Sequence, residues 1–352
     1  MRIGFLANNL NTGCGGGRYA SELVHGLEQR GYQTIALTDI GENSPNPIIR
    51  RGSGMFFSAI EAGKLLRDCD IIHALDGYPY AIVGAMVNKF LKKKFIITAQ
   101  GTYSVAPLYN RTTSWIMRWA YKQADKIIAI SGYTRNEILK KVKLDNISVI
   151  NHGIDLNRFY QEHENPDEKF ILSVGAAKER KGYHISIPAF ARISKKFTDY
   201  KYYIVADNGG KYLSEIAKRE GIADRIVFLE GISDDKLLEL YRKAVLFILT
   251  PVNTEGRHFE GFGLVYLEAA AAGTPVIGTL NTGAEDAVNN GENGFLVPQN
   301  NIDAAADAIG KILGDSALRE KMSIKSHEWA AKHDKNNVIE AYIREYKKLM
   351  TP

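Results

Sequence analysis

The chain alternates short runs rich in valine and isoleucine with amphipathic stretches of helical length, and this alternation limits its fold more than any other feature. Such a pattern is typical of βαβ units, in which helices cover a sheet of parallel strands. It occurs twice, on either side of a polar segment at residues 161–168 that favours a linker. The expected strands are Ile3–Ala7, Thr34–Thr38, Ile71–Ala74, Phe95–Thr98, Lys126–Ile130 and Ser148–Ile150, then Phe170–Val174, Tyr202–Ala206, Ile226–Leu229, Leu246–Thr250, Pro275–Gly278 and Phe295–Val297.

A chain of 352 residues is long for one hydrophobic core, because single cores stop growing at roughly 250 to 300 residues. We therefore expect two Rossmann-like domains, at residues 1–162 and 163–334. Open parallel sheets bind ligands beyond the carboxyl ends of their strands. The predicted class is α/β, with two parallel-sheet domains that face one interdomain cleft, as in cleft enzymes and binding proteins.

Composition excludes several kinds of protein. Hydrophobic residues make up 45% and charged residues 24%, which suits a globular chain with sizeable cores. A net charge of +5 is low for a nucleic-acid binder and fits anionic small molecules or lipid surfaces better. Cys14 and Cys69 lack the spacing of a zinc site or disulfide framework. Without a signal-peptide pattern or a long apolar run, we expect the protein in the cytoplasm.

Glycines follow the first expected strand. Gly15, Gly16 and Gly17 precede a helix that we expect to begin at Arg18, so bare backbone N–H groups and a helix N-terminus face one point, as in anion sites. The loop also fits half of a dinucleotide-binding fold, because Asp39 ends the second strand where a ribose-binding acid would stand. Arg18 occupies the place of the third glycine of that fingerprint, which disfavours a nicotinamide-dependent enzyme.

The most informative segment of the chain begins at Glu260. Gly261 and Gly263 precede a helix expected over Leu264–Ala272, and the N-terminus of this helix can receive a pyrophosphate. Glu260 lies just ahead of that N-terminus, where it can meet a sugar hydroxyl, and Glu268 lies two turns inside, where it can accept from a ribose diol. The plain alternative is a helix-capping acid followed by an exposed surface glutamate.

A basic pair follows the first strand of the second half. Arg180 and Lys181 lie between the strand at Phe170–Val174 and a helix that includes Ile185–Phe197. From the carboxyl end of a strand, the two side chains can reach a diphosphate. The alternative is a solvated loop.

Together these residues resemble the retaining GT-B glycosyltransferases of family 4, which carry two glutamates within Glu-Gly-Phe-Gly…Glu-Ala. Glu260 and Glu268 match that mark. The resemblance covers nearly the whole chain. It includes the Gly15-Gly16-Gly17 loop, Asp70-Ile71-Ile72-His73, Ala129-Ile130-Ser131, His152-Gly153-Ile154-Asp155, Gly175 to Gly182 and Gly273-Thr274-Pro275-Val276.

The resemblance implies a role for each matched residue. Glu260 would contact the donor sugar, Arg180 and Lys181 the pyrophosphate, and Glu268 the ribose. Backbone N–H groups near the start of the glutamate-bearing helix would bind the distal phosphate, and the first glycine loop would face the reacting end. The implied catalytic set is Glu260, Lys181, Arg180 and Gln100, and the implied donor-binding set is Gly15, Gly16, Gly17, Gly261, Phe262, Gly263, Leu264, Glu268 and Gly231.

The same resemblance implies further features. A C-terminal helix at residues 335–352 would join the N-terminal domain, with Tyr342, Ile343 and Tyr346 supplying the contact. No resident metal or other cofactor is implied, and the Asp-x-Asp triplet at residues 68–70 is interpreted as structural.

Two positions depart from the family pattern. Gln100 stands where the family has a histidine, and it can hydrogen-bond a sugar hydroxyl but cannot titrate. Ala176 stands where the family has an arginine, and we predict that Lys178 or Arg257 supplies the missing cation. Gln100 keeps an alternative open, namely a catalytically silent nucleotide-sugar-binding or partner subunit.

The expected activity is that of a retaining hexosyltransferase, with a nucleotide diphosphate sugar as donor and UDP favoured by family frequency. The acceptor would be a glycan, a glycolipid or a small molecule, as in polysaccharide biosynthesis, and no nucleic acid is expected as partner. Lysines at 92–94, 140, 141 and 143 favour peripheral association with the anionic inner face of a membrane, and a solvated face is the alternative. The tyrosines that can stack on acceptor sugar rings are Tyr78, Tyr80, Tyr103 and Tyr109, and the alternative is that they are packing residues.

Overall fold

The computed structural model describes residues 1–11, 15–40, 46–160, 168–207 and 210–351. The chain divides into two compact units, one formed by Met1–His152 with Lys335–Pro352 and the other by Gly153–Asp334. The boundary expected between residues 162 and 163 lies outside the described residues. We call the two parts unit 1 and unit 2.

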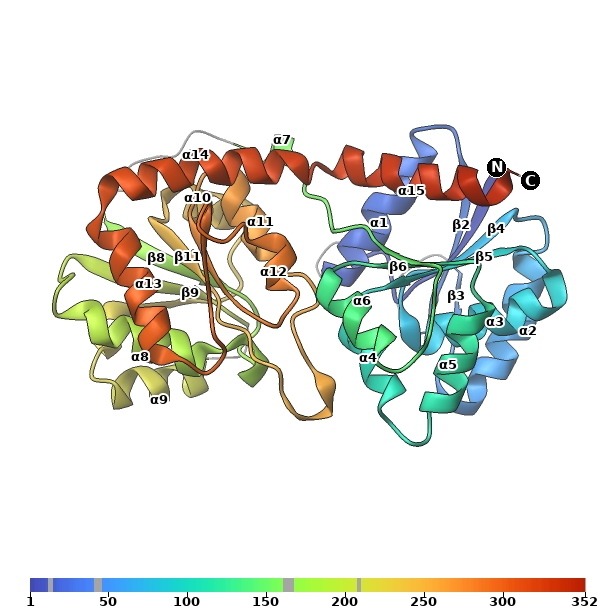
Figure 1. Cartoon of the computed structure of the whole chain (residues 1–352), viewed down its shortest axis with the longest axis horizontal. Helices are drawn as coiled ribbons and strands as arrows, with labels where there is room; N and C mark the ends of the chain where they lie inside the picture. The colour runs from blue at the N-terminus through green and yellow to red at the C-terminus, as the bar shows by residue number, and fades with distance from the viewer. Residues whose placement is uncertain (12–14, 41–45, 161–167, 208–209, 352) are drawn as a thin grey trace. The chain divides into compact units, whose positions relative to one another are not determined.

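Unit 1 is built on a seven-stranded parallel sheet with the order β3-β2-β1-β4-β5-β6-β7 (Figure 1). The central strands β4 and β5 are buried except at Lys94, as continuous apolar runs favour. The strand at the edge, β3, was not predicted, because three residues beginning with a proline form too short a run. The strands are β1 Arg2–Leu6, β2 Gln33–Asp39, β3 Pro47–Ile49, β4 Ile71–Ala74, β5 Lys94–Ala99, β6 Lys126–Ala129 and β7 Ile147–Val149.

Helices connect these parallel strands, as βαβ units require. The first helix begins at Gly15, so the expectation that it begins at Arg18 was wrong by one turn. A glycine run has low helical propensity, which hides the start of this helix from a reading of the sequence. The helices of unit 1 are α1 Gly15–Glu28, α2 Met55–Leu65, α3 Ile82–Leu91, α4 Thr102–Val105, α5 Ser114–Gln123, α6 Gly132–Leu139 and α15 Lys335–Met350.

The last helix, α15, is part of the core of unit 1. Its buried side chains Ile339, Tyr342, Ile343 and Tyr346 pack in one apolar cluster with residues of α1 and of the central strands. A buried polar chain fixes the helix further: His73 on β4 is 2.8 Å from both Tyr346 Oη and Thr98 Oγ1. Burial lowers the pKa of His73 to about 3, so this imidazole is neutral and serves packing.

Unit 2 contains a six-stranded parallel sheet with the order β10-β9-β8-β11-β12-β13. Every strand that the sequence predicts, in both units, is present within two residues of its expected ends. The strands are β8 Lys169–Val174, β9 Tyr200–Val205, β10 Ile226–Leu229, β11 Leu246–Ile248, β12 Val276–Thr279 and β13 Gly294–Val297, and the helices are α7 Leu156–Phe159, α8 Tyr183–Ser194, α9 Gly210–Arg219, α10 Asp234–Lys243, α11 Leu264–Ala271, α12 Ala284–Ala287, α13 Ile302–Gly314 and α14 Ser316–Lys332.

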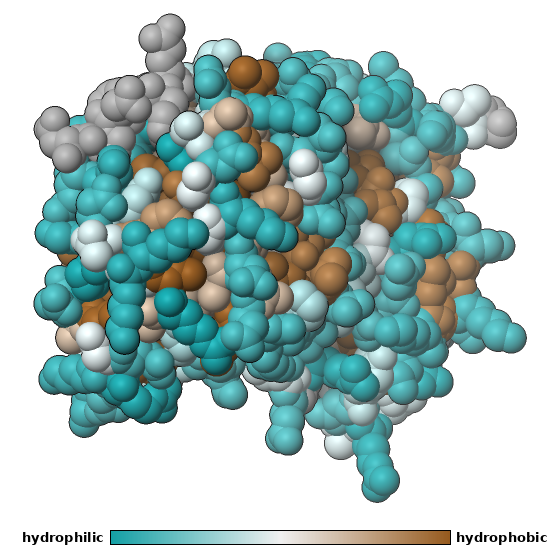
Figure 2. Space-filling model, turned by 60° about the vertical axis from the view of Figure 1, so that its left-hand side comes forward, coloured by the Kyte–Doolittle hydropathy of each residue, from teal (hydrophilic) through white to brown (hydrophobic). Residues whose placement is uncertain are grey.

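The surface of the molecule is mostly hydrophilic on the face drawn in Figure 2, with apolar residues in small groups between the polar ones. Among the described residues, no helix combines the length and apolar character needed to cross a bilayer.

Candidate functional site

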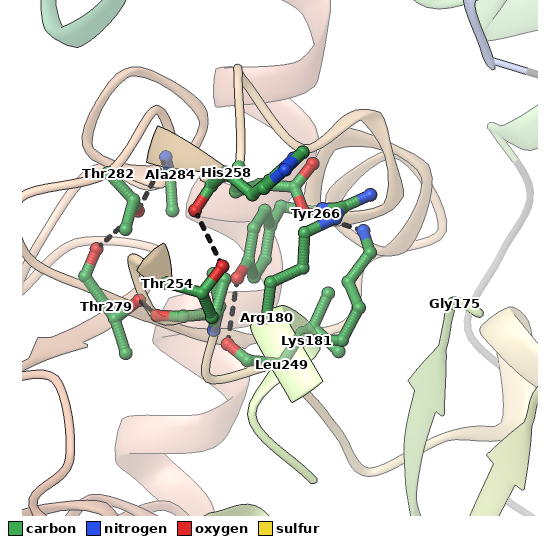
Figure 3. A network of polar contacts seen from close by, with 12 residues as sticks. Gly175, Arg180, Lys181, Leu249, Thr254, His258, Tyr266, Thr279, Thr282 and Ala284 are labelled. Atoms are coloured by element: carbon green, nitrogen blue, oxygen red, sulfur yellow. Dashed lines mark hydrogen bonds and ion pairs between the residues drawn. The ribbon is translucent and has the colours of Figure 1, made fainter. Parts of the chain in front are cut away.

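Three charged side chains meet at the carboxyl end of the unit 2 sheet. Lys181 Nζ lies 2.6 Å and Arg180 Nη1 3.2 Å from the same oxygen of Glu260, Oε2. The two cations extend in the same direction from one short helical turn, Glu179–Lys181 (Figure 3). The side chains of Lys181 and Glu260 are only 11% and 12% exposed, so this is a largely buried ion cluster.

Two loops must approach closely to build this cluster, one after β8 and one after β11. They are joined by hydrogen bonds from Val252 N to Arg180 O at 2.9 Å and from Thr250 Oγ1 to Gly182 O at 2.7 Å. Gly182 has φ of 74°, and a Cβ atom there would lie 1.7 Å from the Thr250 carbonyl oxygen. Only glycine fits this position, where the backbone turns left-handed against a neighbouring strand end.

The electrostatics of the cluster favour a further anion. Burial by itself would raise the pKa of Glu260, but the charges of Lys181 and Arg180 outweigh it and hold the pKa below its ordinary value. Glu260 is therefore ionised, and two cations face one carboxylate. The excess positive charge can accept a phosphate oxygen.

The glycines around Glu260 shape the start of α11. Gly263 precedes the helix with φ of 92°, and a Cβ atom there would lie 2.6 Å from the ring of Tyr266. Because Gly263 has no side chain, the first N–H groups of α11 carry no side-chain cap and remain available to an anion. Phe262 is buried beside them and anchors the turn.

The second glutamate of the motif, Glu268, lies inside α11 and is only 7% exposed. Its Oε2 accepts a hydrogen bond from Tyr241 Oη of α10 at 2.8 Å. The alternative of a capping acid followed by an exposed surface glutamate was therefore wrong: Glu268 is buried, and Glu260 pairs with two cations. A buried carboxylate needs such partners to stay ionised.

Other residues expected at the donor side are placed as follows. Gly231 follows β10 with φ of 61°, and the space beside its Cα is open. Lys178 and Arg257 are exposed, and Arg257 has a left-handed backbone with φ of 62°. The cations that the structure brings to Glu260 are Lys181 and Arg180, so compensation for Ala176 by Lys178 or Arg257 stays a prediction.

In unit 1, the expected residues gather at the carboxyl end of the sheet. Gln100 follows β5, and its Nε2 donates to the Leu75 carbonyl oxygen at 2.5 Å. Its Oε1 lies 3.8 Å from the place of a Cβ atom on Gly16, in the first turn of α1. Gly17 is enclosed, since a Cβ atom there would lie 2.1 Å from Asn9 Oδ1, whereas Gly15 is open. Gln100 and the first helical turn therefore face one another.

One titratable residue of this region was missed in the sequence. Asp76 follows β4, and its Oδ1 accepts from Gly77 N at 2.7 Å and from Ser104 Oγ at 2.6 Å. Ser104 Oγ also accepts from Gln100 N at 3.1 Å, which links Asp76 to Gln100. Burial raises the pKa of Asp76 to about 6. An acid followed by glycine at the carboxyl end of a strand was the available signal.

The ribose-binding role considered for Asp39 finds no support. Asp39 accepts a hydrogen bond from Tyr80 Oη at 3.0 Å and pairs with Arg51 at 3.2 Å. Both carboxylate oxygens of Asp39 therefore already have partners within unit 1, which disfavours ribose binding. In the triplet at 68–70, Cys69 is buried and Asp70 accepts from the Arg2 backbone at 2.8 Å. In the part of the chain that the structure describes, no group of three His, Cys, Asp or Glu side chains is placed to hold a metal ion.

The four tyrosines expected to stack on acceptor sugars differ in exposure. Tyr80 is buried, so for this residue the packing alternative holds. Tyr109 is half-buried, with its hydroxyl 3.1 Å from Glu137, and Tyr78 Oη accepts from a backbone N–H. Tyr103 is 59% exposed and is the one of the four whose ring lies open.

Family comparisons agree with this architecture and site. Residues 157–329 match the family described as glycosyl transferases group 1, and residues 14–158 match Glycosyltransferase Family 4. The two matches together span most of the chain. The chain therefore belongs to the group 1 glycosyltransferases, and its two parallel-sheet units have the GT-B fold.

Relatives are distant but extend along the chain. An uncharacterised glycosyltransferase of Methanocaldococcus jannaschii is 26% identical, over 92% of this chain and 87% of its own. A GDP-mannose-dependent alpha-(1-6)-phosphatidylinositol monomannoside mannosyltransferase of Mycolicibacterium smegmatis is 26% identical, over 72% of this chain and 69% of its own.

Solved structures show the fold. Sucrose-phosphate synthase from Thermosynechococcus elongatus has a TM-score of 0.83 at 20% identity over 99% of both chains. HepE from Anabaena, in complex with UDP, has a TM-score of 0.80 at 18% identity over 99% of this chain and 100% of its own.

Proposed function

We propose that the protein is a retaining hexosyltransferase that moves a sugar from a nucleotide diphosphate sugar to a glycan, a glycolipid or a small-molecule acceptor. The observation that carries this proposal is the ion cluster of Lys181, Arg180 and Glu260 beside the glycine-bounded start of α11. Cations and free helical N–H groups together suit a pyrophosphate, and an adjacent carboxylate suits sugar hydroxyls.

The most demanding step of the proposed reaction is departure of the nucleotide leaving group. As the bond to the sugar breaks, negative charge grows on the nucleotide's phosphate, and fixed cations and N–H groups stabilise that charge. Lys181, Arg180 and the first turn of α11 fill this role in the proposal. The anomeric configuration of the sugar is retained if the acceptor attacks on the face from which the phosphate leaves. In this scheme the departing phosphate takes the acceptor's proton. No separate nucleophilic carboxylate is then needed.

The proposed donor is a UDP-sugar, and no resident metal is required. The Anabaena protein HepE was solved with UDP and with UDP-glucose, which supports this choice. The mycobacterial relative uses GDP-mannose, so the base must be determined by experiment. In a metal-free reaction, Lys181, Arg180 and the N–H groups of α11 would neutralise the charge of the diphosphate without a cation from solution.

On the acceptor side, we propose that Asp76 and Gln100 bind the attacking hydroxyl. Gln100 Oε1 faces the first turn of α1, and Asp76 shares Ser104 with Gln100. Asp76 would supply a titratable group in the region where Gln100 replaces the family histidine. This favours an active enzyme over the silent sugar-nucleotide-binding subunit, which is the second candidate because of Gln100. We expect such an enzyme in the cytoplasm, at the inner membrane face if its acceptor is lipid-linked.

Donor turnover separates the two candidates. The protein is incubated with UDP-, GDP- and ADP-sugars, and thermal shift and released nucleotide are recorded together. One donor should both stabilise the protein and be hydrolysed slowly, and Glu260→Gln should abolish release, while Glu320→Gln on the exposed face of α14 should not. Stabilisation without release would favour the silent subunit, and no response to any donor would contradict both.

A further inference from the structure

An apolar groove of about 640 Å³ opens on unit 1 between α2, α3 and α5. The three helices lie next to one another on this unit (Figure 1). None of the residues proposed above to bind donor or acceptor lines this groove. Its apolar walls are Phe56, Ile60, Met86, Val87, Phe90 and Trp119.

Large apolar side chains of this groove are open to water. Phe56 is 59% exposed, Ile60 48% and Phe90 80%. Exposed apolar groups gathered in this way mark interaction sites, whereas single ones do not. The groove floor is also open, because a Cβ atom on Gly63 would meet no other atom within 4 Å. The surface therefore suits a partner that can bury several of these apolar side chains at once.

The charged residues at this groove all have one sign. Lys64, Arg67 and Lys89 line it, all three are exposed, and none forms an ion pair with any described residue. Across α2, α3 and α5, the single acidic residue is Glu61, which pairs with Arg50 at 3.0 Å. A surface with uncompensated cations beside apolar side chains complements an anionic partner that is itself apolar.

Three of the six lysines that the sequence suggested for a membrane are less available. Lys94 pairs with Asp125 at 3.8 Å, Lys140 pairs with Glu137, and Lys141 lies 4.1 Å from the centre of the Tyr109 ring. These three cations have partners within the protein. Of the groove cations, Lys64 and Lys89 lie on α2 and α3, and Arg67 follows α2.

We infer that this surface, formed by Phe56, Ile60, Lys64, Arg67, Lys89 and Phe90, docks on an anionic lipid bilayer. On α2, Phe56, Ile60 and Lys64 are spaced by four residues and lie on one helical face, and Arg67 lies in the turn that follows the helix. Aromatic rings can enter the acyl boundary while the longer basic side chains reach lipid phosphates. A protein partner would be expected to meet a rim of mixed charge, and among the described residues no acidic side chain lines the groove. The inference assigns a surface to the membrane association expected above, and it does not require the proposed transferase activity.

Vesicle binding tests the inference. The full chain is sedimented with vesicles of phosphatidylcholine alone and of equal parts phosphatidylcholine and phosphatidylglycerol. Binding is expected to the mixed vesicles only, and to fall with added salt because salt screens exposed charges. Lys64→Gln, Arg67→Gln and Lys89→Gln combined should lower the partition coefficient on the order of 100-fold, since each cation near an anionic surface is worth about 1 kcal/mol. Phe56→Ser with Phe90→Ser should lower it at least tenfold.

Matched controls decide the outcome. Lys211→Gln, Lys218→Gln and Lys321→Gln remove the same charge from exposed positions of unit 2, and Ile324→Ser removes an exposed apolar side chain there. These controls should bind as the parent does, and thermal melts should show every variant folded. Equal loss in the controls, absence of binding to the mixed vesicles, or a concentration-dependent dimer that Phe90→Ser abolishes would each overturn the inference.

Discussion

At the scale of single residues, the least predictable feature is the partner of Glu260. Sequence patterns identified Glu260, Lys181 and Arg180 separately, but they could not show that both cations share one carboxylate oxygen. The pairing depends on two loops from different strands meeting at Gly182 and Thr250. Such contacts arise from tertiary packing and have no local sequence signal.

Lys181→Met should lower donor turnover about 10²- to 10³-fold, as removal of one charge-stabilising group does in other active sites. It should also destabilise unit 2, because Glu260 then lies largely buried with one cation fewer. Steady-state kinetics with the identified donor and urea unfolding measure the two effects. Lys218→Met, at an exposed position of α9, is the control and should change neither. Unchanged turnover in Lys181→Met would remove Lys181 from the proposed mechanism.

Asp76 should make stability depend on pH in a defined direction. Burial raises its pKa to about 6, with hydrogen bonds and the Arg51 charge opposing the rise, so the folded protein keeps the proton at a pH where the unfolded chain has lost it. The contribution of this group therefore falls as pH rises from about 4 to above 6, by on the order of 1–3 kcal/mol. Asp76→Asn should remove this dependence.

The comparison is made by urea unfolding of both proteins at pH 5 and pH 8. The parent should lose more stability between the two pH values than Asp76→Asn does, and the variant should be the more stable of the two at pH 8. Parallel behaviour of the two proteins would mean that Asp76 titrates normally. Turnover by Asp76→Asn, measured with the same donor, tests its proposed role toward the acceptor.

At the scale of elements, the sequence predicted nearly all of the sheet architecture. Buried parallel strands are recognisable because they are apolar along their whole length, and this is why β4 and β5 were predicted within a residue of their ends. The edge strand β3 and the first turn of α1 were missed, because proline and glycine weaken the local signal. Of the site, the motif residues were predictable, whereas Asp76 required knowledge of its buried surroundings.

The turn that opens α11 should tolerate no side chain at Gly263. Gly263→Ala would place a Cβ atom against the Tyr266 ring and force alanine into a left-handed backbone, so we expect a loss of about 1–3 kcal/mol in unfolding free energy and weaker donor binding. Gly63→Ala in α2 meets open space and should instead stabilise by about 0.5–1 kcal/mol. Urea unfolding measures both, and equal stability of the two variants would contradict the role given to this turn.

At the scale of the whole molecule, the proposed nucleotide contacts of Arg180, Lys181 and α11 lie in unit 2, whereas Gly15–Gly17, expected at the reacting end of the donor, belong to unit 1. UDP should therefore slow amide exchange in the loop after β8 and in the first turn of α11, and leave the core of unit 1 unchanged. At a hundredfold excess over its dissociation constant, a ligand adds about 2.7 kcal/mol of stability. Hydrogen exchange with and without UDP measures this. If UDP slowed amide exchange only in the first turn of α1, the nucleotide would bind unit 1, and the proposed donor site in unit 2 would be contradicted.

The return of α15 to unit 1 has a consequence for how the protein is made. Ribosomes produce the chain from its N-terminus, yet unit 1 lacks four buried side chains of its core until Ile339 to Tyr346 emerge. At a usual rate of synthesis, the whole of Gly153–Asp334 takes roughly ten to forty seconds to produce. During that time the nascent sheet exposes the apolar surface that α15 later covers. The unit that is translated first is thus the last to receive all of its core residues.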